Sequence, residues 1–260
     1  GAVTVTGTEA DFKIGGHTYD AVVDGQATAP NHYLDIQSAI DAGAKAIFVK
    51  PGTWGAFATS GTGVKRIVGA VAASCFVNAA CSVSTNDVLI EQLNFLQCVV
   101  TNTGDNTTFL GCAFTSSGGA RSGIDVGSNG NDMLVLFCQS LGATSNWIKF
   151  TAAVERPKIV QCRIVDSADA NPLIYDNGFQ VLQGQISACT FDDNSNKAFL
   201  VSLTSSFLWI IAGNTFKSYP YGCINTNLAD ISGNFFNGDA YTITTDASFS
   251  SAITLTVNIP

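Results

Sequence analysis

The stretch KIVQCRIVD, residues 158–166, decides the fold because its pattern recurs along the chain. Apolar residues alternate with other residues on both sides of Cys162, as in a strand with one buried face. Further stretches carry the same pattern, in which a cysteine or asparagine is followed two residues later by an apolar residue. They are FLGCAFTSS (109–117), LVLFCQSLG (134–142), QISACTFDD (185–193), IIAGNTFKS (210–218) and DISGNFFNG (230–238). In LVLFCQSLG a serine takes the place of the apolar residue. LIEQLNFLQC (89–98) has Leu93 at the same place.

The repeat has the period of a solenoid. Its members are residues 93, 112, 138, 162, 189, 214 and 234, spaced 19 to 27 residues apart. A second β-like segment follows each of them, as in GIDV (123–126) and NWIKF (146–150), and turn sequences separate the two. Short strands repeated at this period predict an all-β fold, a single-stranded right-handed parallel β-helix of about 8–10 coils. The crossover rule favours the right hand.

The cysteines fit the core of such a solenoid. Equivalent positions of successive coils lie about 4.8 Å apart, so Cys112, Cys138, Cys162 and Cys189 are expected to form an inward column, which Asn214 and Asn234 continue as an amide ladder. Disulfides or a metal cluster are the alternatives. Cys75 and Cys81 lie off this predicted column and are the pair best placed for a bridge. No CxxC pattern and no partnering histidine indicates zinc, so no metal site is predicted.

The segment IQSAIDAGAKAIFVKPGTW (36–54) places an amphipathic helix, near residues 35–43, before an apolar strand. A helix there would cover the open first coil, whose edge and core are otherwise exposed. With IAGNTF (211–216) and ISGNFF (231–236), this segment resembles the pectin-lyase-like superfamily of right-handed parallel β-helices, and the tailspikes of bacterial viruses in particular. The resemblance covers residues 30–245. Residues 1–29 are expected to form an extended lead-in with a hairpin, and 246–260 a capping or intersubunit strand.

Composition excludes several functions. The 12 basic residues against 20 acidic ones, with a net charge of -8, leave no basic footprint for nucleic acid. No apolar run reaches the roughly 18 residues of a membrane-spanning helix, and no signal peptide is visible. Hydrophobic residues make up 46% of the chain and charged residues 12%, so a large core and a nearly neutral surface are expected.

Two groups of residues are candidates for a site. Under an enzymatic interpretation, Arg163 with Asp166, Asp192 and Asp193 could form a base and an acidic cluster, with Ca²⁺ as cofactor only for a lyase; otherwise no cofactor is expected. A histidine motif such as this fold's polygalacturonases carry does not follow Asp192 and Asp193. The alternative interpretation is a surface ion pair.

The second group would bind carbohydrate. Asp125, Lys149 and Tyr175 alternate with inward isoleucines and are expected to project side by side from one face, with Asp176 nearby, unless they form only a salt bridge beside an aromatic ring. Aromatic rings stack on sugars, and the candidates for such stacking are Trp147, Tyr219 and Tyr221. Trp209, within an apolar run, is expected in the core.

These features, with the resemblance, favour a virion surface protein of tailspike or capsid-decoration type. It would be a homotrimer that contacts other virion proteins and binds host polysaccharide, without nucleic acid or membrane insertion. The alternatives are a secreted polysaccharide lyase or glycoside hydrolase, and a cell-surface adhesin. The fold class is shared by enzymes and inert proteins, so function rests on the site.

Overall fold

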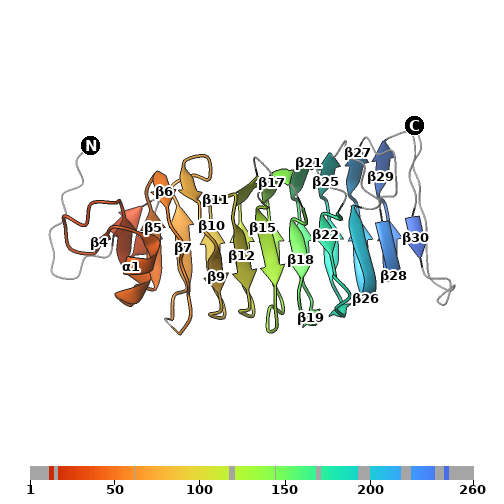
Figure 1. Ribbon diagram of the computed structural model, residues 1–260, viewed down its shortest axis with the longest axis horizontal. Helices are drawn as coiled ribbons and strands as arrows, with labels where there is room; N and C mark the ends of the chain where they lie inside the picture. The colour runs from red at the N-terminus through yellow and green to blue at the C-terminus, as the bar shows by residue number, and fades with distance from the viewer. Residues whose placement is uncertain are drawn as a thin grey trace.

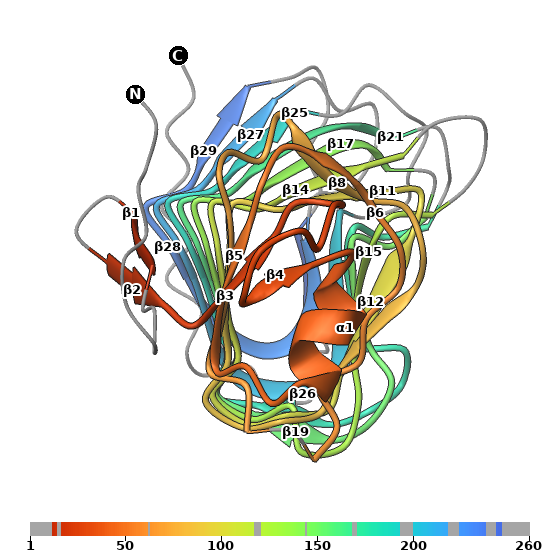
Figure 2. The ribbon, with the colours of Figure 1, turned by 90° about the vertical axis from the view of Figure 1, so that its left-hand side faces the viewer.

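The computed structural model describes residues 12–14, 17–61, 63–116, 121–143, 145–167, 171–192, 200–217, 224–237 and 243–245. Within these ranges the chain winds into an elongated parallel β-solenoid, with successive coils stacked from the N-terminal to the C-terminal end (Figure 1). Seen from the N-terminal end, the strands follow one another clockwise as the chain recedes from the viewer, so the coil is right-handed (Figure 2). The predicted fold class is confirmed.

Each coil contributes strands to three faces. Face 1 consists of β3 (Ala21–Val23), β5 (Ala46–Val49), β7 (Arg66–Gly69), β10 (Leu89–Glu91), β13 (Thr108–Leu110), β16 (Leu134–Leu136), β20 (Lys158–Val160), β24 (Gln185–Ser187) and the second halves of β26 (Val201–Ala212) and β28 (Ile224–Ser232). Face 2 consists of β6 (Gly52–Trp54), β8 (Cys75–Val77), β11 (Asn94–Leu96), β14 (Ala113–Thr115), β17 (Gln139–Ala143), β21 (Arg163–Ser167), β25 (Thr190–Asp192), β27 (Thr215–Lys217) and β29 (Phe235–Asn237).

Face 3 consists of β9 (Cys81–Val83), β12 (Val99–Asn102), β15 (Gly123–Val126), β18 (Ile148–Phe150), β22 (Ile174–Tyr175), the first halves of β26 and β28, and β30 (Ile243–Thr245). Because β26 and β28 run through both faces, faces 1 and 3 form one continuous 19-stranded sheet. Two short strands, β19 (Val154–Glu155) and β23 (Val181–Leu182), pair with each other between faces 3 and 1.

The core is built from columns of equivalent residues. On face 1 the buried column is mostly isoleucine and contains Ala21, Ile47, Ile67, Ile90, Phe109, Val135, Ile159, Ile186, Ile211 and Ile231. The face-2 column contains Trp54, Val77, Phe95, Phe114, Ser140, Ile164, Phe191, Phe216 and Phe236. Its Phe191 and Phe216 rings stack with centroids 4.7 Å apart. The parallel register therefore repeats both burial and ring geometry.

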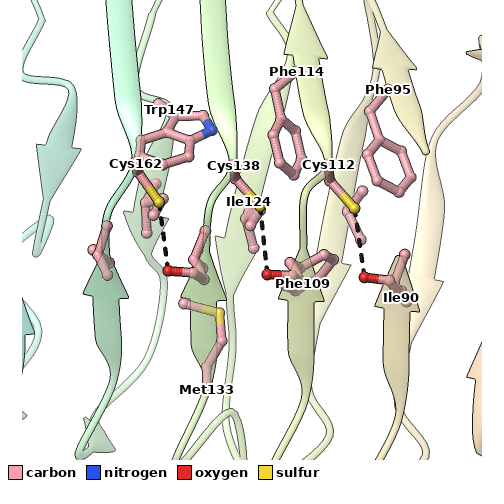
Figure 3. Packing of buried hydrophobic residues seen from close by; sticks show 14 of the residues in the cluster. Ile90, Phe95, Phe109, Cys112, Phe114, Ile124, Met133, Cys138, Trp147 and Cys162 are labelled. Carbon is pink, nitrogen blue, oxygen red and sulfur yellow. Dashed lines mark hydrogen bonds between the residues drawn. The ribbon is translucent and has the colours of Figure 1, made fainter. Parts of the chain in front are cut away.

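The predicted cysteine column lies at the corner between faces 1 and 2, and Figure 3 shows three of its members. Each thiol donates a hydrogen bond to a backbone carbonyl of the preceding coil: Cys112 Sγ to Ile90 O at 3.5 Å, Cys138 Sγ to Phe109 O at 3.4 Å and Cys162 Sγ to Val135 O at 3.4 Å. These acceptors are the central residues of face-1 strands, so each thiol ties the corner to the strand of the preceding coil.

Asparagine replaces cysteine in this column because it makes the same bond. Asn214 Nδ2 donates to Ile186 O at 3.0 Å, and Asn234 Nδ2 donates to Ile211 O at 2.7 Å. The predicted amide ladder is also present, since Asn214 Nδ2 donates to Asn234 Oδ1 at 2.9 Å. Where the column residue is polar, it therefore acts as a donor to the preceding coil, while Leu93 fills the same position by packing alone.

One prediction about the cysteines is wrong. Phe76 pairs with Asn94, which places Cys75 in register with Leu93 and so on the column, and its thiol donates to Val49 O at 3.4 Å. Cys81 lies on face 3, in register with Val100. Both cysteines are free thiols. The irregular spacing of the first coils hid the register of Cys75.

A left-handed residue precedes the column position in each repeat from Leu93 to Asn234. The residues and their φ values are Gln92 (55°), Gly111 (59°), Phe137 (53°), Gln161 (52°), Ala188 (54°), Gly213 (66°) and Gly233 (60°). One residue in this conformation turns the chain sharply from face 1 to face 2. This left-handed conformation costs residues other than glycine about 1–2 kcal/mol. Gly111, Gly213 and Gly233 avoid that cost.

A short helix covers the N-terminal end of the solenoid. Helix α1 (Ile36–Asp41) starts with a capping box, in which Ser38 N donates to Asp35 Oδ1 at 2.7 Å, and it buries Ile36, Ala39 and Ile40. Figure 2 shows α1 lying across the end of the solenoid, as expected of a cap. Its neighbours include β4 (His32–Tyr33).

The solenoid starts earlier than the sequence suggested. Strand β3 pairs in parallel with β5, Ala21 opposite Ile47, so the first rung precedes the apolar strand that follows the helix. The lead-in does contain a hairpin, formed by β1 (Phe12–Ile14) and β2 (His17–Tyr19). It docks through Tyr19, whose ring lies 5.4 Å from that of Phe48. Residues 1–11 and the expected C-terminal strand 246–260 lie outside the described residues.

The hydrogen-bond donor role of the cysteine column can be tested with aspartate and asparagine, two side chains of nearly equal size. Cys162→Asp should lower the free energy of unfolding by about 3–5 kcal/mol, because it buries an unpaired charge that cannot donate to Val135 O. Cys162→Asn should lose clearly less, because the amide can donate as Asn214 does. Urea denaturation of both variants measures the difference, and equal losses would contradict the donor role.

The left-handed corner predicts a second difference. Gly213→Ala should lower the unfolding free energy by about 1 kcal/mol through backbone strain alone, since no atom lies within 4 Å of the added Cβ. Gly55→Ala is the control, because its Cβ also meets nothing and its φ is not positive. Gly55→Ala should be neutral or stabilising. Equal effects of the two variants in thermal melts would count against the strain.

Candidate functional site

Three predicted site residues lie side by side on the outside of face 3. Asp125 pairs in register with Lys149, and Lys149 with Tyr175, so adjacent coils present an acid, a base and a phenol in one row. All three side chains are partly exposed, while the neighbouring isoleucines point into the core. We call Asp125, Lys149 and Tyr175 the face-3 strip.

Arg121 joins this strip, although the sequence did not single it out. Its Nη1 lies 2.6 Å from Asp125 Oδ1, and its Nε donates to Asn146 O at 2.7 Å. Arg121 precedes the strand by two residues, so only the folded turn brings its guanidinium over Asp125. The pair neutralises the one carboxylate of the strip.

Lys149 gives the strip its net charge. No carboxylate of the described residues forms an ion pair with its ammonium group. With Asp125 matched to Arg121, the strip carries one uncompensated positive charge on a chain whose net charge is -8. An exposed cation beside an aromatic ring can hold an anionic or hydroxyl-rich group while the ring stacks against it.

Asp176 is close in sequence but has a structural role. Its side chain is fully buried, and it accepts hydrogen bonds from Ser205 N at 2.6 Å, Ser206 Oγ at 3.0 Å and Gly178 N at 3.3 Å. The carboxylate thus joins two successive coils at the turn after face 3. It does not belong to the exposed strip.

The prediction that Trp147 is exposed and binds sugar is wrong. Its side chain has no exposed surface, and the indole packs edge-on against Phe114 with centroids 6.1 Å apart. Phe114 is followed in the face-2 column by the small Ser140, so the indole fills core space beside it. Trp209 is buried as predicted. Tyr219 and Tyr221 lie outside the described residues.

The enzymatic candidates lie on face 2. Arg163 is exposed, and in register it pairs with Gln139 and Thr190. Asp192 pairs with Val165 and Lys217, one step diagonally from Arg163, as the spacing predicted. Asp166 lies in β21, but its side chain and all of Asp193 are outside the described part of the chain. The acidic cluster is therefore still a prediction.

Two kinds of feature are absent from the described residues. They contain no group of three or more histidine, cysteine or acidic side chains placed to hold a metal ion. They also contain no helix with the length and apolarity needed to cross a membrane.

Comparison with known proteins finds similar structures but no similar sequences. No protein-family model matches the chain, and neither does any curated protein. The solved structures that resemble it include a pectin methylesterase variant in complex with a hexasaccharide, with 12% identity, a TM-score of 0.47 and coverage of 89% of this chain and 94% of the other.

Two more are similar to it: pectin methylesterase from Aspergillus niger, with 15% identity, a TM-score of 0.43 and coverage of 92% and 91%, and PemA from Erwinia chrysanthemi, with 11% identity, a TM-score of 0.41 and coverage of 88% and 93%.

At these identities the likeness concerns the fold alone, and the likeness to tailspikes stays a prediction.

The structural role of Asp176 can be tested. Asp176→Ala should lower the free energy of unfolding by about 2–4 kcal/mol, because it leaves the half-buried Ser205 amide and the buried Ser206 hydroxyl without their acceptor. Asp230→Ala, at an exposed carboxylate of β28, is the control and should change little. An unchanged midpoint for Asp176→Ala in urea would refute the structural role.

These observations assign the architecture alone: the chain folds as a right-handed parallel β-helix.

Proposed function

We propose that this protein binds a polysaccharide along face 3. The observation that carries the proposal is the row of Asp125, Lys149 and Tyr175 on three adjacent coils, joined by the Arg121–Asp125 ion pair. Coils spaced about 4.8 Å apart offer repeated contacts to a repeating polymer. Such binding sums many weak interactions along an extended ligand.

The charge of the strip favours an acidic chain. The Lys149 ammonium is available to a carboxylate or sulfate group of the polymer, and Tyr175 next to it offers a ring face and a hydroxyl. The Arg121–Asp125 pair offers donors and acceptors to sugar hydroxyls. A neutral chain would use only the ring and these polar groups.

Binding fits the strip better than hydrolysis does. Glycoside hydrolysis usually needs two carboxylates facing the same bond. On face 3, Asp125 is held by Arg121, and Asp176 is buried under its three hydrogen bonds. A lyase or hydrolase is the second candidate. It would have to use face 2, where Arg163 and Asp192 lie diagonally adjacent.

The cellular setting of this binding is a proposal of the same kind. Display on a virion surface as a homotrimer would put several face-3 strips on one particle, and this multivalency would raise a weak affinity for host polysaccharide. A secreted location would suit the enzymatic candidate.

The binding proposal is tested with sodium alginate as the acidic polymer and dextran as the neutral one. Wild type should be retarded by alginate in affinity electrophoresis. Lys149→Ala should weaken alginate binding about tenfold, the equivalent of one charge-assisted contact of about 1.4 kcal/mol. Lys158→Ala removes the same charge from an exposed position on face 1 and should bind like wild type.

The outcomes separate the candidates. Equal weakening by both lysine variants would mean that only overall charge matters and would refute a site on face 3. The enzymatic candidate would be supported instead if size-exclusion chromatography showed that wild type shortens the alginate chains and that Arg163→Ala does not.

A further inference from the structure

A depression lies beside α1 at the N-terminal end of face 3. Its volume is about 510 Å³, and it is shallow and widely open to solvent. Ala56, Phe57, Ala58 and Ala80 give it an apolar wall, and Ser82 and Thr101 contribute hydroxyl groups. Neither the sequence analysis nor the face-3 strip accounts for it.

Helix α1 holds the wall of this depression in place. The Gln37 side chain accepts a hydrogen bond from Ala58 N at 2.7 Å and donates one to Asp41 Oδ1 at 2.7 Å. Ala58 in turn forms a parallel bridge with Ser82. The amide of Gln37 is thus occupied in fixing the wall.

The lining is uncharged. Among the described residues that line it there is no acidic or basic side chain, and the thiol of Cys81 is almost fully buried. Burial raises the pKa of Cys81 to about 12, so the thiol is neutral at physiological pH. Small methyl groups and two hydroxyls fit a small apolar substituent on a polar ligand, and they do not fit a free charge.

The depression is continuous with the face-3 strip. Ser82 pairs in register with Thr101, and Thr101 pairs with Asp125. The hydroxyl-bearing floor therefore ends one coil before the charged row begins. A polymer lying on Asp125, Lys149 and Tyr175 and extending toward the N-terminal end would place its next sugar over the depression.

We propose that this depression is the subsite for an acetyl substituent of the polysaccharide that binds face 3. The inference rests on the proposed function. The acetyl methyl group packs against the alanines, and the sugar hydroxyls meet Ser82 and Thr101. The strip supplies attraction to the chain, and the depression distinguishes acetylated from bare units.

The test compares O-acetylated alginate with the same alginate after mild alkaline deacetylation, which leaves the polymer backbone and its carboxylates unchanged. By isothermal titration, wild type should prefer the acetylated form about fourfold, the equivalent of burying one methyl-sized group. Ala80→Trp fills the depression from an exposed position and should bind both forms alike. Ala70→Trp is the control, because Ala70 is exposed directly after β7 and does not line the depression. This variant should keep the preference.

Each outcome decides a different point. If circular dichroism shows that Ala80→Trp misfolds, Ala56→Trp takes its place, because it fills the depression from the other exposed wall. Equal affinity of wild type for both forms, with Lys149→Ala weakening both, overturns the subsite and leaves the proposed function standing. A preference that survives in the folded depression-filling variant, Ala80→Trp or its substitute Ala56→Trp, also overturns it. No binding of either polymer overturns the proposed function together with the subsite.

Discussion

The structure depends on the parallel register between successive coils. Each rung hydrogen-bonds to the next with equivalent residues opposite one another, so every inward position becomes a column and every outward position becomes a row. The columns of isoleucine and of stacked phenylalanine bury a core that no single coil could form. The same register aligns Asp125, Lys149 and Tyr175, so the candidate site arises from the constraint that builds the core.

The bend between faces 1 and 2 is where this register is fixed. A residue of positive φ turns the chain, and the next side chain donates to a carbonyl of the coil before it. Cysteine and asparagine are interchangeable there because both are small and both donate a hydrogen bond. The bend therefore explains why the motif keeps its form while the length of each coil varies. Loops of different length can be inserted elsewhere without moving the columns.

Helix α1 connects the cap of the solenoid to its outer surface. Its apolar side chains cover the first coil, and Gln37 on its polar side fixes the segment that walls the depression. A capping device thereby shapes one end of face 3. The charged strip follows directly along the same row of strands, so the depression and the strip lie on one continuous surface.

The sequence by itself determined the periodic features. The repeat predicted the parallel β-helix, the inward cysteines, the asparagine ladder and the outward row on face 3, because a fixed motif and strict alternation leave one register. It also predicted the capping helix, whose amphipathic pattern is local. The diagonal relation of Arg163 and Asp192 followed from the same spacing.

Only the tertiary structure decided the features that depend on packing between segments without a repeat. Trp147 looks like an exposed aromatic residue in sequence, yet it fills the space beside Ser140. Cys75 joins the column only once β8 is paired with β11, and β3 forms the first rung through its pairing with β5. Arg121 reaches Asp125 across a turn, and Gln37 of α1 bonds to Ala58 in the wall of the depression, about twenty positions along the chain. These contacts depend on volumes and turn geometry in three dimensions, which a one-dimensional period does not encode.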